Sequence, residues 1–106
     1  MLVSRNEAIK TIYVTPGRDL VADEAQAMRR ELKGCMGEHT ERLVLDLARV
    51  KVIDPMGLET IVSTYNWLRM CGAELIVENA TAEMKRIFLL MRGGGRLTIS
   101  CTGWPF

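Results

Sequence analysis

Short runs of aliphatic and β-branched residues alternate along this chain with longer stretches of mixed polarity. Runs of roughly four to eight such residues, bounded by Gly, Pro or polar positions, are typical of β-strands. The run at 42–47 (RLVLDL) is almost continuously apolar, which indicates a strand buried on both faces. Strands are therefore predicted at four places: 9–16, 42–47, 73–79 and 96–100.

The stretches between these runs carry apolar residues at spacings of three and four, which is the period of an α-helix. The three apolar stripes are Val21, Ala25, Met28 and Leu32; then Leu58, Ile61, Val62, Tyr65 and Leu68; and finally Met84, Ile87, Phe88 and Met91. Three helices are predicted from them.

Capping residues set the limits of these helices. Asp54 is a good N-cap for the second helix, and Pro55 suits its first position, where the missing N–H costs nothing. Thr81 caps the third helix in the same way. Gly34 and Gly72 are placed to end the first and second helices.

The predicted order after residue 8 is β-α-β-α-β-α-β. Strands that alternate with helices indicate an α/β domain with a mostly parallel sheet, helices packed on it and right-handed crossovers. A chain of 106 residues is about the size of one domain, and we detect neither a repeat nor a linker. Residues 1–106 are therefore expected to form a single α/β domain.

The helix after Asp54 has a second, unusual stripe. With Leu58 at zero and about 100° per residue, its core face spans about 120°, and the second stripe centres about 160° away. The members of that stripe are Met56, Thr60, Ser63, Trp67 and Met70. Aromatic and Met side chains are enriched at protein interfaces, so the stripe indicates an interaction surface. The alternative is that the C-terminal tail or a neighbouring loop covers part of it.

Composition and charge exclude several classes of protein. The formal net charge is +1 and the charges are scattered, so nothing favours nucleic-acid binding. No stretch reaches the ~20 apolar residues that span a bilayer. The N-terminal MLVSRNEAIK lacks the apolar centre of a signal peptide. Three cysteines, Cys35, Cys71 and Cys101, show no CxxC spacing and indicate free thiols in a reducing compartment. We expect a cytoplasmic protein.

Candidate chemistry is sparse. His39 is the single histidine and stands between Glu38 and Thr40, where a solvated side chain is a better interpretation than a general base. Cys35 lies near it, but nothing indicates an orienting group or an oxyanion site. The RGGGR at 92–96 ends a helix, whereas a phosphate loop opens one. We therefore expect a non-enzymatic protein without metal or cofactor.

The ordered series of motifs over residues 42–100 resembles the STAS domain, the family of anti-sigma factor antagonists and of cytoplasmic domains of sulfate transporters. That family has a strand ending in Asp-Leu, an Ile-Asp-Ser-x-Gly-Leu motif, a helix, a Gly-x-x-Leu-x-Leu strand and a further helix. The matching positions here are Asp46-Leu47, Ile53-Asp54, Gly57-Leu58, Gly72, Leu75 and Arg86-Ile87-Phe88.

The resemblance implies a domain that acts through protein contacts. In the sigma-regulatory branch a partner kinase phosphorylates the serine that follows the Asp, and the added charge ends the interaction. Here that position is Pro55, which has no hydroxyl. Phosphorylation there is chemically impossible. The nearest hydroxyls are Thr60, Ser63 and Thr64, with Thr60 as a weak candidate for modification.

The function expected is a non-catalytic interaction module that binds a serine-kinase-like anti-sigma factor or a scaffold, without phosphorylation at residue 55. Its partner-binding residues are expected to be Asp54, Pro55, Met56, Gly57, Thr60, Ser63 and Trp67. The alternative is an accessory subunit docked on a membrane transporter. A nucleotide-binding protein is a third reading that no residue supports, and a homodimer is compatible with the same stripe.

Overall fold

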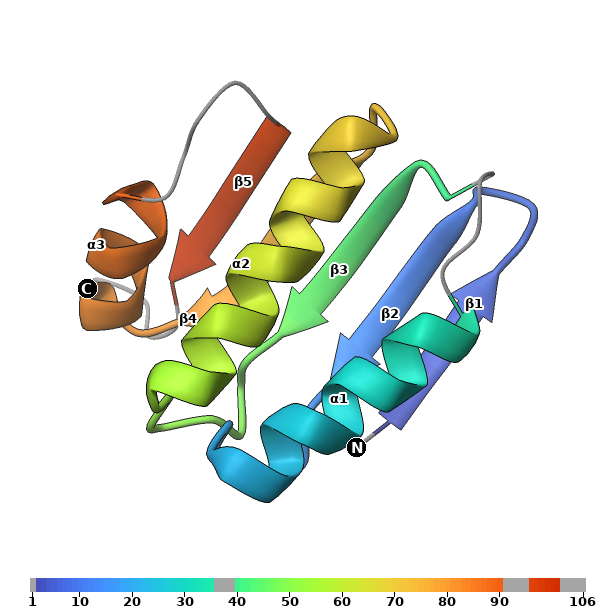
Figure 1. Cartoon of the computed structure of the whole chain (residues 1–106). Helices are drawn as coiled ribbons and strands as arrows, with labels where there is room; N and C mark the ends of the chain where they lie inside the picture. Colours follow the sequence, from blue (N-terminus) through green and yellow to red (C-terminus); the bar gives the residue numbers. More distant parts are fainter. Residues whose placement is uncertain (1, 36–39, 91–95, 102–106) are drawn as a thin grey trace.

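The computed structural model describes residues 2–35, 40–90 and 96–101 (Figure 1). Over these residues the chain follows the order β1-β2-α1-β3-α2-β4-α3-β5. The strands are β1 (Leu2–Asn6), β2 (Thr11–Thr15), β3 (Arg42–Asp46), β4 (Glu74–Ala80) and β5 (Arg96–Cys101). The helices are α1 (Ala22–Cys35), α2 (Pro55–Met70) and α3 (Ala82–Leu90).

The described strands form one sheet in chain order, β1-β2-β3-β4-β5. Strands β2 to β5 are parallel neighbours, which confirms the mostly parallel sheet expected from the sequence. Strand β1 was not predicted and pairs antiparallel with β2. The turn between them takes up residues 7–10, so β2 begins at Thr11 and the strand predicted from residue 9 is wrong in its first two positions.

The sheet buries one face under the helices. Alternate positions of the inner strands are at most 1% exposed: Ile12, Val14, Leu43, Leu45, Leu75 and Val77. In Figure 1, α1 and α2 cross in front of the sheet, and α3 lies beside β5. The alternating positions on the other face include Tyr13, at 39% exposure, and Val44, which is buried. The inner strand β3 is thus buried on both faces at its centre, as its continuous apolar run predicts.

The helices use the predicted stripes with a few exceptions. Ala25, Met28 and Leu32 of α1 are buried, as are Ile61, Tyr65 and Leu68 of α2 and Met84 and Phe88 of α3. Leu58 and Val62 are partly buried. Val21 and Ile87 are instead 40% and 39% exposed, so their assignment to the core stripes is wrong. Met91 and the glycines at 93–95 lie outside the described residues.

The predicted caps are confirmed for the second and third helices. The Gly57 N–H donates to Asp54 Oδ1 at 2.8 Å, and the Met84 N–H donates to Thr81 Oγ1 at 3.1 Å. Helix α2 ends at Met70, and Gly72 follows with φ of +73°, a left-handed conformation that favours glycine. None of the helices in the described part of the chain has the length and apolarity needed to cross a bilayer.

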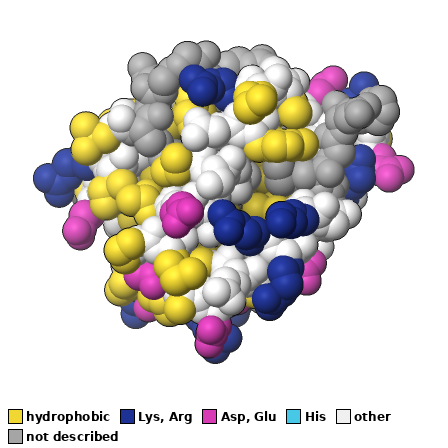
Figure 2. All heavy atoms as spheres, viewed as in Figure 1, with side chains coloured by type: hydrophobic (Ala, Val, Ile, Leu, Met, Phe, Trp, Pro, Cys, Tyr) yellow, Lys and Arg dark blue, Asp and Glu magenta, His cyan; other side chains and the backbone are white. Residues whose placement is uncertain are grey.

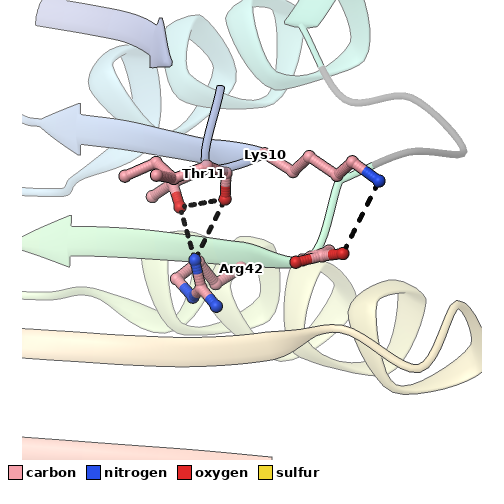
Figure 3. Close-up of polar contacts among 5 residues, drawn as sticks. Lys10, Thr11 and Arg42 are labelled. Carbon is pink, nitrogen blue, oxygen red and sulfur yellow. Dashed lines mark hydrogen bonds and ion pairs between the residues drawn. The ribbon is translucent and has the colours of Figure 1, made fainter. Parts of the chain in front are cut away.

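Polar contacts close the sheet at the amino ends of β2 and β3 (Figure 3). Arg42 donates from Nη1 to the Ile9 carbonyl at 3.0 Å and to Thr11 Oγ1 at 3.1 Å. Lys10 and Glu41 form an exposed ion pair beside them at 3.7 Å. These contacts hold the strand ends in register. The loops that carry the site described below leave from the opposite, carboxyl ends of the same two strands.

Candidate partner-binding surface

The segments after β2 and β3 meet at Asp54, which caps two helices at once. Its Oδ1 accepts from the Gly57 N–H of α2, and its Oδ2 accepts from the Ala22 N–H of α1 at 3.0 Å. Val21, the residue before α1, has no side-chain acceptor of its own. Asp54 therefore supplies the cap that α1 lacks, from 32 positions along the chain.

Backbone hydrogen bonds join the same two segments. The Leu20 N–H donates to the Val52 carbonyl at 3.0 Å, and the Asp54 N–H donates to the Leu20 carbonyl at 3.1 Å. On the other side, Asp19 Oδ1 accepts from the Lys51 and Val52 N–H groups, at 2.7 and 3.1 Å. Residues 19–22 and 51–57 thus form one hydrogen-bonded corner, which the sequence did not predict because its partners are distant along the chain.

Both acids of the corner are held ionised. The N–H groups of Lys51 and Val52 lower the pKa of Asp19 below its usual 3.8. The N–H of Ala22, followed by that of Gly57, lowers the pKa of Asp54 in the same way. Hydrogen bonds to a carboxylate favour its charged form, and the Asp54 charge lies at the positive ends of two helix dipoles. At neutral pH the corner therefore carries two stable negative charges.

Gly57 allows the two segments to cross closely. It is buried, and a Cβ at this position would meet the Leu20 carbonyl oxygen, with the Leu20 Cβ at 3.0 Å and the Ile53 Cγ2 at 3.1 Å. Any side chain would push α2 away from Leu20. The structure places Gly57 in the packing beneath the corner, so it carries no exposed side chain for a partner.

Solvent-exposed apolar side chains surround the corner. Val21, Val52 and Met56 are 40%, 52% and 43% exposed, and Pro55 is also exposed. We call these four residues the corner patch. Figure 2 shows hydrophobic side chains gathered at the lower left, over the amino end of α2 and along α3. Sequence reasoning found Pro55 and Met56 but missed both valines, because Val21 fits a helical stripe and Val52 sits in an apolar run.

The rest of the predicted stripe on α2 divides into three environments. Ser63 and Met70 are exposed, and Trp67 is partly buried and packs against the core. Thr60 is only 6% exposed, and its hydroxyl donates to the Met56 carbonyl at 3.0 Å. The expected outward position of Thr60 is therefore wrong, and the hydroxyl considered for phosphorylation is buried and hydrogen-bonded.

Helix α1 is what covers this side of α2. The two helices border an open groove of about 440 Å³, lined by Arg29, Leu32, Lys33, Thr60, Ser63, Thr64 and Trp67. Within the described residues, part of the stripe is covered by a helix, whereas the C-terminal tail, considered as an alternative cover, lies outside them. Exposed Met56 and partly buried Trp67 thus belong to two different parts of the surface.

Metal-binding geometry is absent from the described residues, which contain no group of three or more His, Cys, Asp or Glu side chains suited to hold an ion. Cys71 is a free, exposed cysteine on the carboxyl side of α2. His39 lies outside the described residues. The corner itself combines exposed apolar side chains with two ionised carboxylates.

A family model of the STAS domain matches residues 3–101. The chain therefore belongs to the STAS domain family, as its motifs suggest. The structure of the anti-sigma factor antagonist SpoIIAA in its unphosphorylated form aligns with a TM-score of 0.75 and 12% identity, over 93% of this chain and 87% of that one. A Thermotoga maritima protein assigned as an anti-sigma factor antagonist aligns with the same score and 13% identity, over 95% and 86%.

A third solved structure is larger. The murine anion transporter Slc26a9, in its inward-facing state, aligns with a TM-score of 0.63 and 21% identity, over 81% of this chain but only 14% of the transporter. No curated protein sequence matches this chain significantly. At these identities the structural likeness establishes the STAS fold alone.

Proposed function

We propose that this protein is a non-catalytic interaction module of the anti-sigma factor antagonist type, acting in the cytoplasm. Its partner is an anti-sigma factor of the serine-kinase type or a regulatory scaffold. The corner patch makes the central contact, and Asp54 fixes its shape while Ser63 and Trp67 extend the surface along α2. The observation that supports this proposal is the exposure of Val52 and Met56 on a corner held by hydrogen bonds.

A rigid apolar corner suits protein recognition for energetic reasons. Ordering a flexible loop on binding costs free energy, and the hydrogen bonds around Asp54 and Asp19 have already ordered this one. Exposed apolar side chains next to fixed charges also give a partner both contact area and a polar rim. Burial of Met56 and Val52 in a partner is then favourable by the hydrophobic effect.

Pro55 determines how such a module is regulated. It is exposed at the first position of α2 and has no hydroxyl, so no phosphate ester forms there. The buried Thr60 hydroxyl is a poor substitute. We therefore propose a binder whose contact is independent of phosphorylation at residue 55, and whose control depends on the amount or state of the partner.

The test uses the full chain as bait in a cytoplasmic extract, followed by calorimetry with the purified partner. Replacing Val52 and Met56 by Glu puts charge into the contact, and the affinity should fall by about tenfold or more. Met70→Glu is the matched control because Met70 lies on the same helix and is 83% exposed. If the double variant recovers the same partner with unchanged affinity, the corner patch is not the binding surface.

The likeness to the Slc26a9 transporter supports a second candidate, an accessory subunit docked on the cytoplasmic face of a membrane transport system. Extraction of the membrane fraction with detergent separates the two. Co-purification with a permease, and with no soluble kinase, favours the accessory subunit. Measurement of the bait's mass in solution shows whether the partner is instead a second copy of this chain.

A further inference from the structure

The groove between α1 and α2 is distinct from the corner patch in both shape and charge. Its volume of about 440 Å³ lies within the range of small-molecule sites. Leu32 and Thr64 are buried at its base, and Trp67 forms a partly buried wall. The groove therefore combines a base of Leu32 and buried threonines with a partly exposed aromatic side chain.

Two cations stand over this groove. Arg29 and Lys33 lie one turn apart on α1, both exposed, and both line it. Like charges at this spacing repel each other. Neither forms an ion pair with any described residue, and no acid is found among the described residues that line the groove. Figure 2 shows Lys and Arg side chains gathered over the region between α1 and α2.

The remaining polar groups of the lining are divided between base and rim. Thr60 and Thr64 donate their hydroxyls to carbonyls of their own helix, at 3.0 and 2.8 Å. Ser63 is exposed, and neither its hydroxyl nor the Trp67 indole N–H donates to another described residue. The described lining thus offers two cations and a Ser63 hydroxyl that donates to no described residue, beside the Trp67 side chain.

We propose that this groove binds a small organic anion, in which a phosphate or carboxylate is attached to a flat apolar ring. The acidic group lies between Arg29 and Lys33, where charge-assisted hydrogen bonds relieve their mutual repulsion. The ring packs against the Trp67 indole and Leu32. This ligand site does not use the corner patch, although it shares Ser63 and Trp67 with the extension of the proposed partner surface along α2.

The test follows the fluorescence of Trp67 in the full chain. The sequence contains two tryptophans, so a Trp104→Phe background leaves Trp67 as the single reporter. The probes are 1-naphthyl phosphate, inorganic phosphate and 2-naphthol, which supply anion plus ring, anion alone and ring alone. Naphthyl phosphate should give a saturable change and bind at least about tenfold more tightly than either fragment, because both halves of the site contribute.

Charge variants locate the site. Replacing Arg29 and Lys33 by Gln should weaken the binding of naphthyl phosphate by about tenfold or more through loss of charge-assisted hydrogen bonds. Arg30→Gln is the matched control, since Arg30 is exposed on the same helix but does not line the groove. All three side chains are exposed, and circular dichroism verifies that each variant is folded. Equal affinity in the double variant and the control, equal affinity for 2-naphthol, or no response of Trp67 would overturn the proposal.

Discussion

At the scale of single residues, Asp54 carries most of the corner's geometry. The Asp54 carboxylate accepts from the first turns of both α1 and α2, and the Asp54 backbone N–H donates to the Leu20 carbonyl. A sequence motif of Ile-Asp followed by a helix shows only the cap of that helix. The capping of α1 by Asp54 is needed because Val21 has no side-chain acceptor. It can be identified only from the structure, in which the two segments lie together.

The lowered pKa of Asp54 predicts a dependence of stability on acidity. The folded protein releases its proton more readily than the unfolded chain, whose value is near 3.8, so this stabilisation is complete above that pH. It is lost as the pH falls through the lower pKa of the folded state. Thermal melts between about pH 6 and pH 2.5 should show the wild type losing stability faster below pH 4 than Asp54→Asn.

The same substitution also acts at neutral pH. An Asn side chain has one oxygen acceptor, so it caps α2 or α1 but not both, and Asp54→Asn should melt at lower temperature than the wild type.

Asp19→Asn should likewise reduce the dependence of stability on acidity, because the N–H groups of Lys51 and Val52 lower the pKa of Asp19. Parallel pH profiles for the wild type and both variants would show that these carboxylates are not responsible.

Gly57→Ala tests the close crossing of Leu20 and α2. The added Cβ meets the Leu20 carbonyl, and such overpacking typically costs about 1–3 kcal/mol of unfolding free energy. Gly34→Ala is the matched control, because no atom of the described residues lies within 4 Å of its Cβ position and alanine favours a helix. Denaturant unfolding measures both. Equal effects of the two substitutions would mean that the crossing is not tight.

At the scale of elements, the sequence predicts what local chemistry determines. The limits of α2 follow from Asp54, Pro55 and Gly72, and the structure confirms them to within a residue. Strand β1 was not predicted, because apolar and polar residues do not alternate clearly enough in its sequence, LVSRN, to indicate a strand. Its pairing with β2, from Leu2 opposite Thr15 to Asn6 opposite Thr11, is a backbone property. Side-chain pattern alone cannot identify such a strand.

Helix α3 provides the element-scale prediction. It is nine residues long, so its amino-terminal cap is a large part of its stability. Thr81→Ala removes the acceptor for the Met84 N–H and should lower the unfolding free energy by about 1 kcal/mol. Thr81→Ser keeps the acceptor and should stay close to the wild type. Urea unfolding distinguishes them, and a similar loss in both variants would assign the effect to the missing methyl group.

At the scale of the whole molecule, the packing of α1 beside α2 determines which side chains of α2 are exposed, and the sequence does not predict that packing. A helical wheel divides α2 into core and outward faces as if only the sheet lay behind it. Because α1 packs alongside, Thr60 and Thr64 are buried between two helices, and Trp67 becomes the wall of a groove. Among the residues predicted for partner binding, Pro55 and Met56 are therefore exposed at the corner, whereas Thr60 is buried along the helix. Their role in binding a partner stays a prediction.

The proposed function requires that the corner be ordered before a partner arrives, and amide hydrogen exchange tests this. The amides of β3 lie between two paired strands and should exchange most slowly. The Leu20 and Asp54 amides donate across the corner, so their protection should resemble that of strand amides and exceed that of exposed loop amides. If both exchange as fast as an exposed loop, the corner orders only on binding. Part of the binding energy would then be spent on that ordering, and a weaker complex is expected.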